Sequence, residues 1–98
     1  MIRDIDIDEH GNAPNCDLHR ATNDRAKWNN HANVDKKLVW GPNGSPFGES
    51  DDIIVPAHGN ITSGEITTPQ PAPARFPYEI RAARAAAEPA ADPQLIVH

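Results

Sequence analysis

The chain has 98 residues and a net charge of −5, enough for one domain. Its apolar fraction is 38%, but fourteen of those residues are alanine and only three are leucine, which argues against a helical bundle. Ten prolines and six glycines exclude long uninterrupted helices, and the acidic balance argues against a phosphate-binding face and a nucleic-acid partner.

Compartment signals are sparse. The single cysteine, Cys16, cannot form an internal disulfide. Residues 1–8 contain three aspartates and no apolar run, and no segment has the roughly 18 apolar residues of a membrane span. We therefore expect no membrane partner, and a cytoplasmic location unless a leader was removed. Without a leader, we interpret the glycosylation sequons at residues 43–45 and 60–62 as chance matches.

Strand patterns run through most of the chain. Ile5 and Ile7 alternate with three aspartates, which predicts a strand with one polar face that ends at the turn-forming residues 11–15. Residues 16–24 fit no single period. Further strands are expected at residues 25–29, 36–40, 53–55, 61–67, 76–80 and 95–97, with turns at 29–33 and 59–60.

The remaining segments separate these strands. Residues 41–48 should be irregular, with Phe47 inserted into the core, and the prolines of residues 69–73 indicate an extended link that caps a sheet edge. Residues 81–91 contain seven alanines and fit either a short helix or a loop. About seven short strands predict an all-β fold, a single β-sandwich domain over residues 1–98.

The order of several short motifs resembles a known family. These motifs are Trp28-Asn29-Asn30, the strand ending at Trp40, and residues 45–48, 54–59, 76–80 and 92–97. In that order and spacing, residues 2–97 resemble a bacterial cupredoxin-like domain. The resemblance implies a Greek-key sandwich of two sheets.

The resemblance does not extend to the family's copper site. A blue-copper centre needs a thiolate, two imidazoles and a weak axial methionine. The resemblance places Ile80 where the cysteine would stand, and residues 81–92 contain no His, Cys or Met. His31 matches the first ligand position but lacks the other ligands, and Met1 is at the wrong end of the chain. We therefore expect no type-1 copper and no cofactor.

Histidines offer a different metal hypothesis. The five histidines, at positions 10, 19, 31, 58 and 98, have neither the strand nor the helix spacing of a ready metal site. They fit ordinary surface side chains. The alternative is copper or zinc bound by imidazoles that converge in three dimensions, with His31 brought to within about 4 Å of His58 or His98.

The acidic run at residues 4–9 has two interpretations. The first is a strand with a solvated acidic face. The second is a calcium loop of the EF-hand type starting at Asp6, with Asp8 third, His10 fifth and Asp17 twelfth. His10 and Pro14 are poor substitutes for the usual ligands and no helices flank the loop, so the strand is favoured and a surface calcium contact is the alternative.

Candidate nucleophiles are few. Cys16 precedes Asp17 and His19, which would allow a thiolate nucleophile, although the aspartate would raise the thiol pKa; the alternative is a small buried or half-buried thiol. Ser45 and Ser63 do not lie in a strand-turn-helix elbow.

Two further features belong to the core or to ligand binding. The glycine-rich residues 41–48 lack the lysine and helix start of a phosphate loop. Trp28 and Trp40 are expected in the core, with Trp40, beside Gly41 and Pro42, the better candidate for stacking on a ligand. No set of acid, base and nucleophile converges.

These observations favour a non-enzymatic β-sandwich module that binds a protein partner or associates with itself, since sheet edges invite strand pairing. Two alternatives remain open. One is metal binding through the histidines. The other is a structural subunit or decoration protein of a larger assembly.

Overall fold

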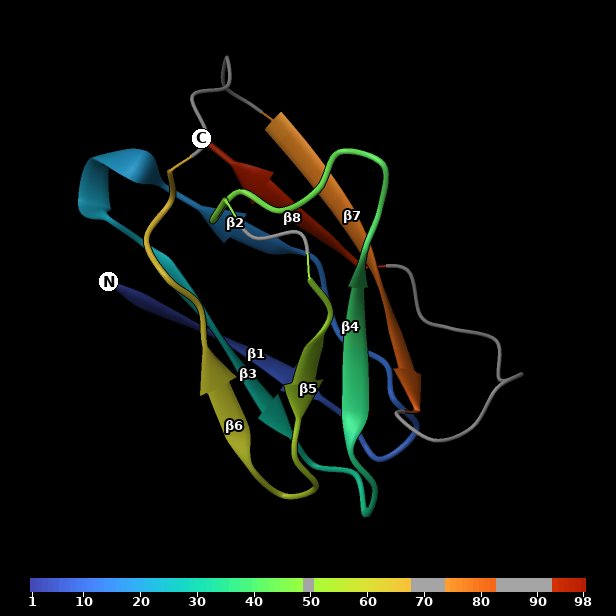
Figure 1. Ribbon diagram of the computed structural model, residues 1–98. Helices are drawn as coiled ribbons and strands as arrows, with labels where there is room; N and C mark the ends of the chain where they lie inside the picture. The colour runs from blue at the N-terminus through green and yellow to red at the C-terminus, as the bar shows by residue number, and fades with distance from the viewer. Residues whose placement is uncertain (49–50, 68–73, 83–92) are drawn as a thin grey trace.

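The computed structural model describes residues 1–48, 51–67, 74–82 and 93–98, and it is an all-β structure of two sheets (Figure 1). One sheet has the order β1-β3-β6, with β1 at Ile2–Ile7, β3 at Arg25–Asn30 and β6 at Asn60–Thr62. The other has the order β2-β8-β7-β4-β5, with β2 at Cys16–Leu18, β8 at Gln94–Val97, β7 at Ala74–Ala82, β4 at Lys36–Trp40 and β5 at Ile53–Val55. One 3-10 turn, η1, covers Arg20–Thr22.

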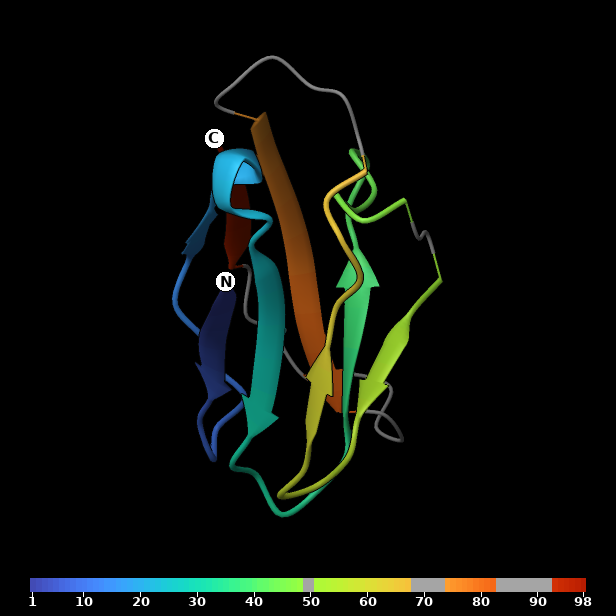
Figure 2. The same cartoon turned by 90° about the vertical axis from the view of Figure 1, so that its left-hand side faces the viewer.

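Two strand pairs are parallel and the other pairs are antiparallel. β1 runs parallel to β3, and β2 runs parallel to β8. Figure 2 shows the three-stranded sheet in front of the five-stranded sheet, with β1 and β2 on one side of the molecule and β5 on the opposite side. We call the side formed by β1 and β2 the β1–β2 flank. Both sheets therefore expose an edge strand on this flank.

Alternating side chains bury one face of each strand. The pattern predicted for β1 is confirmed, since Ile5 and Ile7 are fully buried and the intervening aspartates are exposed. The core is formed by fourteen apolar residues: Ile5, Ile7, Leu18, Ala26, Trp28, Leu38, Trp40, Phe47, Val55, Phe76, Tyr78, Ile80, Leu95 and Val97. Burial of apolar surface stabilises a fold by about 25 cal/mol per Å². Burial of these side chains is therefore the main force that holds the sheets together.

Four aromatic rings form the centre of this core. Trp28 lies edge-on to Trp40, Phe47 and Tyr78, with ring centroids 6.0–6.3 Å apart, a geometry that aromatic quadrupoles favour. The indole N–H of Trp28 donates to the Tyr78 hydroxyl at 3.1 Å. The predicted core positions of Trp28, Trp40 and Phe47 are therefore confirmed.

A buried amide joins the two sheets at one end of the sandwich. Asn30, at the end of β3, is 2% exposed. Its Nδ2 donates to the carbonyls of Val34 at 3.0 Å and Val55 at 3.1 Å, and its Oδ1 accepts from the Ala32 amide at 2.9 Å. Because Val55 belongs to β5, this one side chain fastens the end of β3 to the edge strand of the other sheet.

The predicted all-β class is confirmed, with eight strands in the described residues where about seven were expected. Residues 16–24, which fit no period, contain β2 and η1. The turn expected at residues 59–60 lies earlier, because Asn60 already belongs to β6. The strand expected at 61–67 ends at Thr62, since the Ser63 hydroxyl replaces a backbone acceptor and takes the Ala26 amide at 3.0 Å.

The other strand boundaries differ by only a few residues. β3 extends one residue beyond the expected 25–29, and β7 is longer than the expected 76–80. The proline link at 69–73 lies outside the described residues, and so does the alanine-rich segment beyond residue 82. Among the described residues no helix has the length and apolar character needed to cross a bilayer.

Candidate functional site

The three histidines singled out as metal candidates have three different partners. His31 Nε2 lies 3.3 Å from Asp6 Oδ1, and His98 Nε2 lies 2.9 Å from Asp17 Oδ1. His58 is at the tip of a turn with a positive φ of 56°, and its Nε2 lies 2.9 Å from an amide oxygen in the preceding loop. Within residues 1–48, 51–67, 74–82 and 93–98, no three His, Cys, Asp or Glu side chains are grouped to hold a metal ion.

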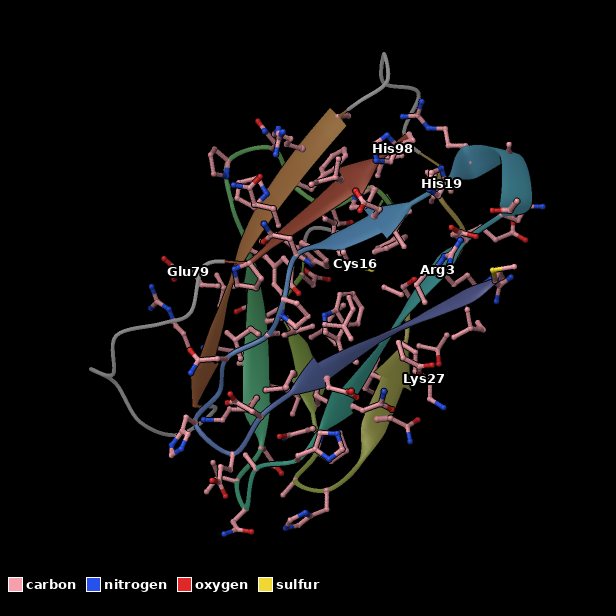
Figure 3. All side chains as sticks on the ribbon, turned by 180° about the vertical axis from the view of Figure 1, so that it is seen from behind. Arg3, Cys16, His19, Lys27, Glu79 and His98 are labelled. Carbon is pink, nitrogen blue, oxygen red and sulfur yellow. The ribbon has the colours of Figure 1, made fainter. Side chains whose placement is uncertain are left out.

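One histidine pair was missed by sequence reasoning. The rings of His19 and His98 stack with centroids 4.9 Å apart and an angle of 20° between their planes, at the end of the parallel pair β2 and β8 (Figure 3). Their separation of 79 positions hides the contact, and only the β2–β8 pairing could have revealed it. The Cys16 thiol lies on β2, the strand that ends just before His19, but the His19 ring stacks on His98 and not on the thiol.

The Cys16 side chain is half-buried, as one interpretation of the sequence predicted. Burial raises the pKa of its thiol, and the negative charge of Asp17 raises it further. Ser45 and Ser63 are both buried. The Ser63 hydroxyl donates to the Gly64 carbonyl at 3.0 Å, and the Ser45 hydroxyl accepts from a backbone amide at 3.3 Å. These groups have packing and hydrogen-bonding roles.

The residues expected to form a calcium loop do not come together in three dimensions. Asp8 Oδ1 accepts the backbone amides of His10 at 2.9 Å and Asn12 at 2.8 Å, so its carboxylate closes its own turn. The Asn12 amide is the main reason that the pKa of Asp8 is lowered. Asp17, the expected twelfth ligand, instead contacts His98 from β2. The strand with an acidic face is the interpretation that the structure supports.

A shallow pocket lies beside Trp40, on the outer face of the five-stranded sheet. It has a volume of about 240 Å³ and is lined by Val39, Trp40, Gly41, Pro42, Pro77, Tyr78 and Glu79. The Trp40 ring is 9% exposed and packs against the aromatic core, so it does not present a free face for stacking on a ligand. Its Nε1 is buried without a hydrogen-bond partner in the described part of the chain.

The most complete set of unused binding groups lies along β1. The amide of Arg25 donates to the Met1 carbonyl, and the amide of His31 donates to the Ile7 carbonyl, both at 2.9 Å. Successive backbone groups of a parallel strand point to opposite sides. The odd-numbered residues of β1 therefore bond to β3, and the even-numbered residues direct their N–H and C=O groups away from the sheet.

These outward groups belong to Ile2, Asp4 and Asp6. They form three N–H and C=O pairs about 6.6 Å apart, and no other group in the described residues bonds to them. The side chains of the same three residues are exposed on the outer face of the sheet. β1 thus has the geometry of a sheet edge that can accept another strand.

The other edge strands have shorter rows of free backbone groups than β1. β2, β5 and β6 have three residues each, against six in β1. β5 is also followed directly by Pro56, which has no N–H to donate to a further strand. Among the strands that the structure describes, β1 therefore provides the longest edge for strand addition.

Comparisons with known proteins give no relative. No family model matches the chain, and no characterised protein and no solved structure matches it.

Proposed function

We propose that this protein is a non-enzymatic interaction module, a cupredoxin-like Greek-key sandwich that binds an extended segment of a partner protein along β1. The observation that carries the proposal is the row of three outward N–H and C=O pairs on Ile2, Asp4 and Asp6. Main-chain hydrogen bonds to such an edge provide affinity, and alternate side chains provide specificity.

The strand arrangement supports the cupredoxin-like part of the proposal. The orders β1-β3-β6 and β2-β8-β7-β4-β5, with one parallel pair at the edge of each sheet, fit a sandwich in which the chain crosses repeatedly between layers. Ile80, which the resemblance aligns with the copper-binding cysteine, is 3% exposed in the core. An alkyl side chain cannot supply the thiolate, so the proposal includes no blue copper.

The environments of the nucleophile candidates support a role without catalysis. A reactive cysteine needs a lowered pKa, whereas the pKa of the Cys16 thiol is raised by burial and by Asp17. The Ser63 hydroxyl is occupied in holding β3, because it accepts from the Ala26 amide and donates to a carbonyl. Both groups serve the fold.

Selection of peptides from a random library on the folded protein tests this function. We expect enriched peptides that bind the natural chain and the Asp4→Ala variant but bind the Asp4→Pro variant much more weakly. Proline removes only the outward N–H of residue 4, which is not used by β3, and edge strands tolerate proline there. Failure to enrich any peptide, or equal binding to both variants when both are folded, would overturn the proposed function.

A further inference from the structure

We propose that the segment that pairs with β1 is basic, with lysine or arginine at every second position on its outer face. This inference rests on the proposed function and adds the chemistry of the partner. It follows from the coincidence, at the same residues of β1, of free backbone groups and exposed carboxylates.

Two carboxylates stand directly beside the free edge. Asp4 and Asp6 each accept a hydrogen bond from Asn29 Nδ2, at 3.2 and 3.3 Å. Lys27 is opposite Asp4 in the register of β1 and β3, yet no ion pair within 4 Å joins them in the described structure. Asp6 Oδ1 also lies 3.3 Å from His31 Nε2, a contact between two exposed side chains. Both carboxylates remain exposed to a strand on the other side.

Other carboxylates near the β1–β2 flank add negative charge, although Glu9 lies 3.5 Å from His10 and Asp17 lies 2.9 Å from His98. Asp8 and Glu9 follow β1, and Asp17 is exposed on β2. The basic side chain of β1, Arg3, is engaged, since its Nε donates to the buried carboxylate of Asp24 at 3.0 Å. A basic segment would meet an acidic surface here, and the two charges would steer the encounter.

The register of an added strand determines which of its side chains meet these charges. Its residues opposite Asp4 and Asp6 lie on the outer face, with Cβ atoms about 4.5–5.5 Å from theirs if the strands are antiparallel. The intervening residues turn toward the buried side of the sheet, where Ile5 and Ile7 lie. The partner sequence should therefore alternate basic residues with small or β-branched ones.

The same charges disfavour a second copy of this chain as the occupant. Antiparallel pairing of two β1 edges would bring Asp4 and Asp6 of one copy against the same residues of the other, and like charges directly opposite destabilise a sheet. Aspartates on an edge strand are a common protection against such self-pairing.

The peptide selection also tests the inference. We expect the enriched peptides to carry lysine or arginine at alternate positions. Enriched peptides that are neutral or acidic, and that still require the N–H of residue 4, would overturn the basic partner and leave the proposed function standing. If no peptide is enriched, both the basic partner and the proposed function are overturned.

A defined peptide measures how much the carboxylates of Asp4 and Asp6 contribute to binding. The probe is an acetylated nine-residue peptide in which lysine alternates with threonine, and its Kd is measured by calorimetry. Two cross-strand charge pairs correspond to about a two- to thirtyfold change in Kd. We expect a loss in this range for the Asp4→Asn, Asp6→Asn double variant, and no loss for the Asp51→Asn, Asp52→Asn double variant, which changes the net charge equally on the opposite side.

Two further versions of the peptide and a sedimentation measurement complete the test. A version of the peptide with its alternate amides N-methylated on the β1 side should not bind, although its charge is unchanged. A version with glutamate in place of lysine should also not bind. Equal binding of the methylated peptide, or dimers of the free protein in sedimentation, would overturn the inference.

Discussion

Replacement of Asp24 by asparagine should destabilise the fold more than any other single charge change on the β1–β2 flank. The Asp24 side chain is completely buried between the end of η1 and β3. Its carboxylate accepts the Thr22 hydroxyl at 2.6 Å, the His19 amide at 2.9 Å and Arg3 Nε at 3.0 Å. The amino group of Met1 lies 3.7 Å away. One carboxylate thus ties the start of β1 to the turn after β2.

The magnitude follows from these contacts. A hydrogen bond to a charged group contributes about 1.5–3 kcal/mol, and removal of one partner of a buried ion pair costs about 3–5 kcal/mol. Arg3 is 40% exposed, which reduces the cost, and asparagine keeps one acceptor oxygen. We expect Asp24→Asn to lower the free energy of unfolding by about 2–3 kcal/mol at pH 7, or to lower the Tm by about 10–20 °C.

The effect should depend on pH in a defined direction. Burial acts to raise the pKa of Asp24, but the three hydrogen bonds and the charge of Arg3 outweigh it and hold the pKa well below the usual range. The stabilisation is therefore complete above the pKa of about 3.9 of an unfolded aspartate, and it is lost as the pH falls through the lower folded-state value. The difference in free energy of unfolding between the natural chain and Asp24→Asn should stay constant from pH 7 to about pH 5 and narrow below about pH 4.

Urea denaturation followed by tryptophan fluorescence measures this gap, because Trp28 is fully buried in the folded chain. Asp51→Asn is the matched control, since Asp51 is an exposed aspartate on the other side of the molecule. An Asp24→Asn midpoint equal to that of the control at pH 7 would refute the reasoning. A gap that stays constant at low pH would refute the assigned role of the charge.

Three other substitutions or reactions test the rest of the fold. Asn30→Ala should lower the free energy of unfolding by about 2–4 kcal/mol in urea, because it leaves the Val55 carbonyl and two other backbone groups unpaired. Gly41→Ala should cost about 1–3 kcal/mol by the same measurement, since its Cβ would lie 2.8 Å from the Pro77 carbonyl oxygen. Cys16 should react with a disulfide reagent at pH 8 much more slowly in the folded than in the urea-unfolded chain, because burial raises its pKa; equal rates would contradict this.

Much of the fold could be predicted from the sequence because side-chain alternation records burial. Ile5 and Ile7 indicated β1, and Phe47 was assigned to the core from within an irregular loop; both lie where expected. Alternation does not record which strands pair. The parallel pairs β1–β3 and β2–β8 join segments that no local signal connects, and β2–β8 brings His19 and His98 together.

Buried polar residues were the hardest to anticipate. Asp24 and Asn30 look like ordinary turn residues in the sequence, yet each is almost fully buried and makes three hydrogen bonds. One bond of each reaches a distant segment, from Asp24 to Arg3 and from Asn30 to Val55. Ser63 ended a strand that composition alone predicted to continue. In each case the distant partner is brought near by strand pairing or sheet packing, which composition and periodicity do not reveal.

The acidic face of β1 shows what side-chain alternation predicts about a strand and what it does not. Side-chain alternation shows that Asp4 and Asp6 point to solvent, but it does not tell which residues direct their backbone groups toward the neighbouring strand. That depends on pairing with β3, which uses the odd-numbered residues. Since the even-numbered residues then carry both the carboxylates and the free N–H groups, a strand that pairs with this edge must meet both. Asp4→Ala removes the carboxylate, and Asp4→Pro removes both the carboxylate and the free N–H. The difference in peptide affinity between these two variants therefore isolates the contribution of the backbone N–H.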